Sequence, residues 1–209
     1  MEMRFFYSIY LNNNVLEFKL WLEAGQIPKC VMLLGAPGVG KSRIGRRFVQ
    51  HGFHHALIDD YFKKLLGGET KVSFGDPQQK QLFRTATKMF TQDLYGNLMP
   101  NKQNIVTEKT GRNLYTIQMT KENCDKFGYL LYGILILTNL DTALARNLGR
   151  TDRQVDANEL ASEYGQIYQP ENVEGMKNIF GEQFFFTVEN ESPADELKIN
   201  QVVQKIVGA

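Results

Sequence analysis

The stretch that decides the fold is Lys29-Cys30-Val31-Met32-Leu33-Leu34-Gly35-Ala36-Pro37-Gly38-Val39-Gly40-Lys41-Ser42. It opens with an apolar run that ends in glycine, which is typical of a strand buried on both faces of a parallel sheet. It closes with the pattern G-x-x-x-x-G-K-[ST], and a helical pattern over 41–49 follows. A loop of this pattern between a buried strand and a helix predicts a site for nucleotide phosphates.

The residue types of this loop suit phosphate chemistry. Its glycines let the backbone N–H groups point inward, the helix start adds the positive end of its dipole, Lys41 can reach the β- and γ-phosphates, and Ser42 can ligate Mg²⁺. The alternative is a glycine-rich turn that binds nothing, and the strand before it and the helix after it argue against that. We therefore predict ATP and Mg²⁺ as ligands. The expected nucleotide contacts are Gly35, Ala36, Pro37, Gly38, Val39, Gly40, Lys41 and Ser42.

Composition narrows the class of protein. The 209 residues are 43% hydrophobic and 22% charged, as in a soluble globular domain, and no apolar run approaches the ~20 residues that cross a bilayer. The N-terminus does not resemble a signal peptide, so we expect a cytoplasmic protein without a membrane partner. Cys30 and Cys124 have no metal-ligand spacing and are expected to be buried. A net charge of +1 argues against a broad nonspecific nucleic-acid surface.

Strand and helix patterns alternate along the chain. Apolar runs at 56–58, 104–107, 130–137 and 184–188 add four expected strands, with helical patterns over 82–94 and near the C-terminus. Ser192, Pro193 and Asp195 predict the start of the last helix. The expected fold is α/β: a three-layer P-loop NTPase fold with a five-stranded, mainly parallel sheet. We expect one domain over 29–209, with 1–28 as an extension packed on it.

Two acidic residues follow the second expected strand. Asp59 and Asp60 would lie at the carboxyl edge of the sheet, beside the loop. Phosphoryl transfer to a hydroxyl needs a carboxylate that accepts the proton. The other interpretation is that one of them caps the following helix, and the pair alone does not decide between the two.

An arginine-rich segment follows the fourth expected strand. Residues 146–155 contain Arg146, Arg150 and Arg153 together with a glycine. Arginines stabilise charge on a transferring phosphoryl group, and a mobile segment brings them in while it excludes water. We expect a lid over about 146–156. A solvated run of charge is the plainer interpretation, but the position of the segment after a core strand favours a lid.

These motifs resemble the kinase domain of polynucleotide 5'-hydroxyl kinases and the related bacteriophage and zeta-toxin-type P-loop kinases. The resemblance covers most of residues 30–190 and lies in the loop, the Asp-Asp-Tyr stretch at 59–61 and the Arg-Asn-x-x-Arg stretch at 146–150. It implies Asp59 as general base with Asp60 beside it. It also implies Arg150 on the phosphates and Arg146 near the nucleotide base. Residues 107–112 resemble the Asp-Gly-Thr-Gly stretch of the phage members.

The chain departs from that pattern at two places. Glu108 stands where an aspartate is usual, so its contact with Mg²⁺ would be longer and through water. Phe62, followed by Lys63 and Lys64, replaces the arginine that grips a neighbouring phosphate in polynucleotide kinases. An aromatic ring at this position suits a base better than a phosphate.

The acceptor is the least determined part of the prediction. Lys80, Arg84 and Lys88 form an i,i+4 line that could follow a nucleic-acid backbone or be a solvated helix face. The favoured function is a kinase acting on a nucleic-acid hydroxyl, a polynucleotide 5'-hydroxyl or a hydroxymethylated base of phage-type DNA. The alternatives are a kinase of nucleotide sugars or nucleosides, and an ATPase or nucleotide-binding module without an acceptor. Expected acceptor contacts are Asp60, Phe62, Lys63, Arg84, Arg112 and Arg153. The oligomeric state is left open.

Overall fold

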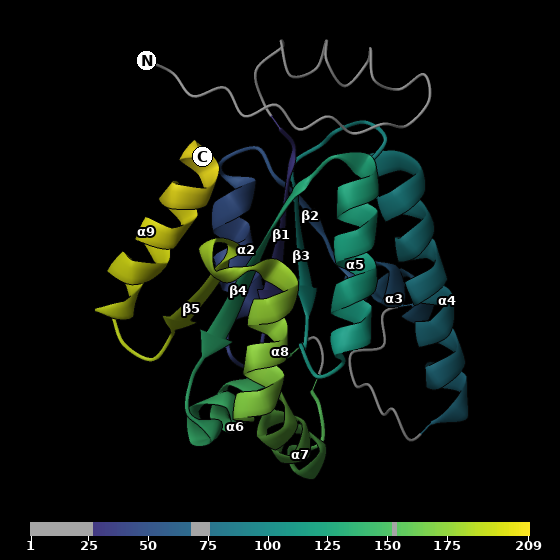
Figure 1. Cartoon of the computed structure of the whole chain (residues 1–209). Coiled ribbons are helices and arrows are strands. Elements are labelled where there is room, and N and C mark those ends of the chain that lie inside the picture. The colour runs from purple at the N-terminus through teal and green to yellow at the C-terminus, as the bar shows by residue number, and fades with distance from the viewer. Residues whose placement is uncertain (1–26, 68–75, 152–153) are drawn as a thin grey trace, which may run out of the picture.

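A single parallel sheet organises the computed structural model, which describes residues 27–67, 76–151 and 154–209. Five strands lie in the order β2-β3-β1-β4-β5, and every neighbouring pair is parallel. The first strand, β1, lies in the centre, with β2 and β3 on one side of it and β4 and β5 on the other (Figure 1). This reversal places a crevice at the carboxyl ends of the central strands, where ligands bind in open α/β sheets.

The bounds of the elements follow the order of the chain. The strands are β1 (Lys29–Leu34), β2 (His54–Ala56), β3 (Ile105–Lys109), β4 (Leu130–Leu137) and β5 (Phe185–Glu189). The α-helices are α2 (Lys41–Val49), α3 (Ile58–Leu66), α4 (Pro77–Asp93), α5 (Leu114–Phe127), α6 (Leu140–Leu148), α7 (Ala157–Ile167), α8 (Pro170–Phe180) and α9 (Asp195–Gly208). A π-helix, η1 (Leu94–Leu98), continues α4, and a short 3₁₀ helix, η2 (Glu182–Phe184), precedes β5.

The central strand confirms the prediction from its sequence. All six residues of β1 are buried, since β3 and β4 flank it and helices cover both faces. The second strand differs from the prediction. It ends at Ala56, and Ile58 already belongs to α3. The acidic pair Asp59 and Asp60 in the first turn favours the helix there, because carboxylates stabilise a helix N-terminus.

Two helices differ from their predicted patterns. Met89 lies within the apolar helical pattern over 82–94 but is 38% exposed, and Leu197, in the apolar pattern near the C-terminus, is 69% exposed. Helix α9 also begins at Asp195 rather than just after Ser192. The Asp195 carboxylate nevertheless accepts the backbone N–H of Ser192 (2.9 Å), so the expected pair does organise the helix start, with the acid as acceptor.

Helices cover the sheet on both sides. Helices α2 and α9 pack together on one face, while α5 and α8 lie on the other (Figure 1). Helices α3 and α4 pair beside the β2 edge, and α6 and α7 lie at the carboxyl end of the sheet. Cys30 and Cys124 are both buried in the main core, as predicted. No helix within the described ranges is long and apolar enough to cross a membrane.

Candidate functional site: a phosphate cradle at the carboxyl edge

The loop between β1 and α2 has the backbone that a phosphate cradle needs. Gly38 and Gly40 have φ angles of 85° and 95°, which side chains other than glycine rarely adopt. Gly40 is the N-cap of α2, and Lys41 is the first residue of the helix. The Lys41 Nζ donates to the carbonyl oxygens of Gly35 (2.8 Å) and Ala36 (2.9 Å), so its ammonium group lies over the loop.

Helix α6 forms one wall of the cradle. A Cβ atom added to Gly38 would lie 2.2 Å from the carbonyl oxygen of Ala143, so only glycine permits this close approach. Arg146 follows Ala143 by three residues and therefore lies on the same side of α6, toward the cradle. One guanidinium nitrogen of Arg146, Nη1, is buried and has no hydrogen-bond partner among the described residues. A buried cationic donor without a partner fits a missing ligand, as the predicted role near the nucleotide requires.

Two polar side chains hold the backbone of the cradle in its shape through hydrogen bonds. The buried side-chain amide of Asn190 donates to the Val39 carbonyl oxygen at 2.7 Å. Gly40 leaves room for it, since a Cβ there would lie 2.3 Å from the Asn190 Nδ2. The Tyr168 hydroxyl accepts the backbone N–H of Ala36 (3.2 Å) and donates to the Ile136 carbonyl oxygen (2.7 Å). The shape of the loop therefore depends on β4 and on the residues that directly follow α7 and β5.

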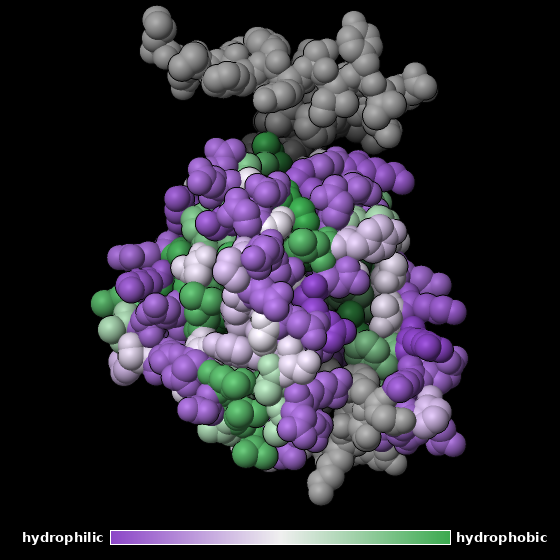
Figure 2. Space-filling model, turned by 60° about the horizontal axis from the view of Figure 1, so that its bottom comes forward, coloured by the Kyte–Doolittle hydropathy of each residue, from purple (hydrophilic) through white to green (hydrophobic). Residues whose placement is uncertain are grey.

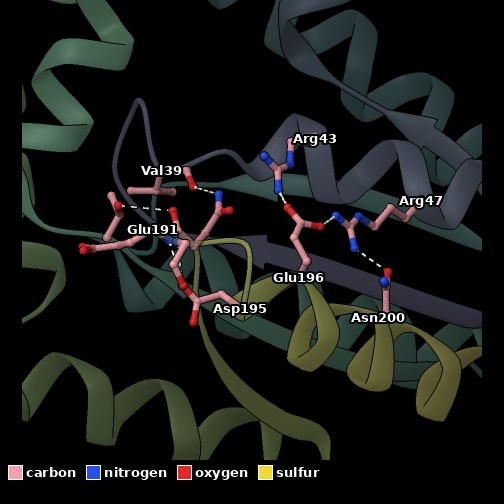
Figure 3. Close-up of polar contacts among 10 residues, drawn as sticks. Val39, Arg43, Arg47, Glu191, Asp195, Glu196 and Asn200 are labelled. Atoms are coloured by element: carbon pink, nitrogen blue, oxygen red, sulfur yellow. Dashed lines mark hydrogen bonds and ion pairs between the residues drawn. The ribbon is translucent and has the colours of Figure 1, made fainter.

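The segment that carries Asn190 is itself fixed by polar contacts (Figure 3). The Glu191 carboxylate accepts from the backbone and side chain of Asn139. Glu196 lies between the guanidinium groups of Arg43 and Arg47. These bonds join the segment after β5 and the start of α9 to the N-cap of α6 and to one side of α2, and α6 and α2 are the two helices that flank the cradle.

Glu108 occupies the position expected of a residue near a metal. It lies in β3 beside Leu33 of β1, and its carboxylate accepts from the Ser42 hydroxyl at 3.2 Å. His55 of β2 contacts the other carboxylate oxygen at 3.0 Å. The His55 ring packs where a Cβ on Gly45 would lie only 2.5 Å from it, so α2 needs a glycine at this point.

The charge of Glu108 is stabilised by its neighbours. Burial raises the pKa of the carboxyl group, but the hydrogen bond from His55 and the charge of Lys41 outweigh burial, and the pKa lies below its ordinary value. An ionised carboxylate beside a hydroxyl at the phosphate loop is an oxygen donor set that fits Mg²⁺. Ser42 and Glu108 are thus the residues that would hold the ion.

The acidic pair lies at the same edge, although on a helix rather than at the end of a strand. Asp59 is half-buried and Asp60 is exposed in the first turn of α3, whose N-cap is Leu57 and has no side-chain cap. Neither acid occupies the cap position, so the capping interpretation does not hold.

The structure contradicts the prediction made for Phe62. Its ring is 1% exposed and packs edge-on against Phe83 at 5.4 Å between centroids. Phe62, Leu66 and Ala86 form the small core that joins α3 to α4. The prediction that Phe62 contacts the acceptor is therefore wrong for this structure, because the apolar contact between two helices uses the ring.

The predicted basic contacts are spread over the surface. Lys63 on α3 and Arg84 on α4 are exposed, as are Lys80 and Lys88 on the same face as Arg84. Arg112 lies between β3 and α5 and forms an ion pair with Glu163 of α7 (3.2 Å). The structure thus places Arg112 at the junction of β3, α5 and α7.

The predicted lid begins inside a helix. Arg146 belongs to the last turn of α6, and Arg150 follows its end at Gly149. The Gln154 side chain donates to the carbonyl oxygens of Leu148 (2.9 Å) and Arg150 (3.0 Å) and shapes this turn. Arg153, the third predicted arginine, lies outside the described residues, as do residues 1–26 of the predicted extension over 1–28.

The molecule presents this edge as a polar surface. Figure 2 brings the lower end of Figure 1 forward and shows a mostly hydrophilic face, with hydrophobic residues in small separate groups. A parallel sheet of this order, a cradle after β1 and an arginine segment after β4 together define the fold class of the P-loop kinases.

The family follows from the sequence match. The chain matches the model of the Zeta toxin family over residues 12–205 and belongs to that family. No curated protein sequence matches the chain at a significant level.

Several solved structures share the fold. Shikimate kinase from Acinetobacter baumannii, in complex with shikimate, is 17% identical, with 89% of this chain and 97% of that chain covered and a TM-score of 0.55. A gluconokinase from Sinorhizobium meliloti is 14% identical, with 88% and 91% covered and a TM-score of 0.52. A structure from the PezAT chromosomal toxin-antitoxin system of Streptococcus pneumoniae is 14% identical, with 96% and 97% covered and a TM-score of 0.54. At such identities the likeness concerns the fold.

Sequence reasoning did not find three residues of this site. Asn190, Tyr168 and His55 hold the cradle or Glu108, but none of them belongs to a motif. The sequence contains only a weak indication for His55, which is a polar residue in a short strand. Asn190 follows a strand end directly, which is where site residues gather in a parallel sheet.

Proposed function

We propose that the chain is an ATP-dependent kinase that transfers the γ-phosphoryl group to a hydroxyl of a small soluble molecule of the nucleotide-sugar or nucleoside class. The observation that carries the proposal is the arrangement of cationic groups around the cradle. Lys41 lies over the loop, and Arg146 of α6, the helix that packs on Gly38, has a buried guanidinium nitrogen without a partner among the described residues. Such an arrangement suits a polyphosphate.

The residues at the edge supply the parts of an in-line transfer. Asp59 accepts the proton of the acceptor hydroxyl, whose oxygen forms a bond to the γ-phosphorus. The bond from that phosphorus to the oxygen bridging to the β-phosphate breaks, and ADP leaves. Lys41 and Arg150 stabilise the charge on the oxygens of the transferring group. Mg²⁺ held by Ser42 and Glu108 would neutralise part of the phosphate charge.

A small acceptor is preferred to a nucleic acid for two reasons. Phe62, the aromatic residue proposed to stack on a base, is buried between helices. The exposed basic residues Lys80, Arg84 and Lys88 lie on the outer face of α4, which pairs with α3 beside the sheet edge rather than at the cradle. Two of the solved structures with this fold are kinases named for small molecules, shikimate kinase and gluconokinase.

The proposal is tested with ATP labelled on the γ-phosphate. Purified protein is incubated with DNA, RNA, DNA with hydroxymethylated bases, nucleosides and nucleotide sugars, and the products are separated by size. We expect label in a small-molecule ester, and none with Lys41→Ala, which removes the cation over the cradle. Label in a polymer would support the nucleic-acid alternative instead. Release of inorganic phosphate alone, with every acceptor, would reject the kinase.

A further inference from the structure

A small cavity with both polar and apolar lining lies next to the residue that precedes the candidate base. Its volume is about 80 Å³, and its polar lining comes from Thr87, Thr91, Tyr95, Thr107, Lys109 and Thr120. Ile58, which directly precedes Asp59, also lines it. The cavity therefore reaches the start of α3, where the proposed proton acceptor lies.

The strand alternation separates this cavity from the metal-binding position. Neighbouring residues of a strand point to opposite faces, so Thr107 and Lys109 share one face of β3 while Glu108 points to the other. Glu108 meets Ser42 and His55 on the α2 side. Lys109 faces α4, η1 and α5, which supply the other polar residues of the cavity. The two sites are thus on opposite sides of the same strand end.

Lys109 is the charged residue of this lining. None of the described residues forms an ion pair with it, and the rest of the cavity lining is neutral. Burial lowers the pKa of its ammonium group. Three of the lining hydroxyls are engaged, since Thr87, Thr91 and Thr120 each donate to a carbonyl oxygen one turn earlier. A half-buried cation without a partner lowers stability, which suggests that a ligand compensates for it.

The backbone around the cavity also departs from regular structure. Helix α4 passes into the π-helix η1 at Leu94, and both Leu94 and Tyr95 line the cavity. Single-turn π-helices are rare and are found frequently at functional sites. The departure here brings the Tyr95 ring to the cavity that contains Lys109.

We propose that Lys109 binds an anionic group of the acceptor, a phosphate or a carboxylate, while Asp59 binds the hydroxyl that receives the phosphoryl group. This inference rests on the proposed function. The cavity has room for several water molecules or one small oxyanion rather than for a whole acceptor. The remainder of the acceptor then extends along α3 toward the cradle. Acceptors that carry both a hydroxyl and an anion are favoured over neutral ones.

The test uses inorganic phosphate as the probe. Protein is first saturated with Mg²⁺ and a non-hydrolysable ATP analogue, so that the cradle is filled, and phosphate is then titrated by calorimetry. Four proteins are compared: wild type, Lys109→Met, Lys109→Arg and the control Lys64→Met, which removes an exposed lysine of α3. We expect Lys109→Met to weaken phosphate binding by about tenfold or more, because one charge-assisted hydrogen bond is lost.

The other variants show whether the change in phosphate binding is due to the charge of Lys109. Lys109→Arg should retain most of the binding, and Lys64→Met should bind as the wild type does. Lys109→Met should melt at the wild-type temperature or above it, since removal of a desolvated charge does not destabilise the fold. Equal phosphate affinity in wild type and Lys109→Met, or no phosphate binding by the wild type, would overturn the inference.

Failure of this inference is distinguishable from failure of the proposed function. The titration requires no turnover, so a Lys109-dependent phosphate site without transfer to any acceptor would reject only the kinase. Transfer to neutral and anionic acceptors alike, unchanged in Lys109→Met, would reject only the anion site.

Discussion

Replacement of Asn190 by alanine tests whether the Asn190 side chain holds the backbone of the cradle in its shape. The side chain is 4% exposed, and its amide donates to the Val39 carbonyl oxygen at 2.7 Å. The backbone of Asn190 bonds to Leu137, and this bond is independent of the side chain. Asn190→Ala therefore removes one defined hydrogen bond and leaves a buried carbonyl oxygen of the cradle without its donor.

The magnitude follows from that loss. An unsatisfied buried acceptor lowers the free energy of unfolding by about 1 to 3 kcal/mol. Without this bond, the Val39 carbonyl oxygen no longer fixes the shape of the loop. Nucleotide binding must then restore that shape, and the free energy needed for this reduces the free energy of binding. Each 1.4 kcal/mol so used weakens the affinity about tenfold. Asn190→Asp should weaken nucleotide affinity at least as much, because its carboxylate faces the Val39 carbonyl oxygen without a proton to donate.

The assay compares nucleotide affinity by calorimetry with the melting temperature of the same proteins. Asn104→Ala is the matched control, since the Asn104 side chain accepts a hydrogen bond of 2.9 Å from the Lys29 backbone at the opposite end of the sheet. It should reduce stability and leave nucleotide affinity unchanged. If Asn190→Ala lowered the melting temperature but had the same nucleotide affinity as Asn104→Ala, the Asn190 side chain would not shape the cradle for nucleotide.

Three further predictions concern the edge of the sheet. Asp59→Asn should reduce turnover strongly with ATP affinity nearly intact, and Asp60→Asn should be milder; the reverse order in steady-state kinetics would move the base to Asp60. Arg150→Lys keeps the charge but loses the planar fork, so turnover should fall more than ATP affinity, whereas equal losses would restrict Arg150 to ground-state binding. The lowered pKa of Glu108 means that its ionised form stabilises the fold above the ordinary value of 4.5, and that this contribution is lost as the pH falls through the folded pKa. Melting curves from about pH 6 to about pH 3 should therefore fall more for wild type than for Glu108→Gln, and parallel curves would contradict this.

Local patterns predicted the parts of the fold that depend on neighbouring residues. The apolar run of β1, the glycines of the loop and the start of α2 are contiguous, so their sequence contains the whole signal. The second strand shows the limit of such patterns. Ile58 continues an apolar run and suggests a strand, but it is already the first residue of α3, whose start the carboxylates of Asp59 and Asp60 stabilise.

Contacts between distant segments could not be predicted in this way. Asn190 is 151 positions from Val39, and Tyr168 is 132 positions from Ala36; only the order of the strands brings them to the cradle. The burial of Phe62 has the same origin, since it depends on how α4 packs against α3. A residue that looks suited to a ligand can instead fill a contact between helices.

The fate of the γ-phosphorus decides whether the protein is a kinase of small molecules. Wild type and Lys41→Ala are incubated with ATP and the small-molecule fraction of a cell extract, and the products are followed by ³¹P NMR. Wild type should convert the γ-phosphate into a new phosphate ester of a small molecule, with one ADP formed per ester, and Lys41→Ala should form none. ADP with inorganic phosphate and no ester in the wild-type sample would contradict the proposed function.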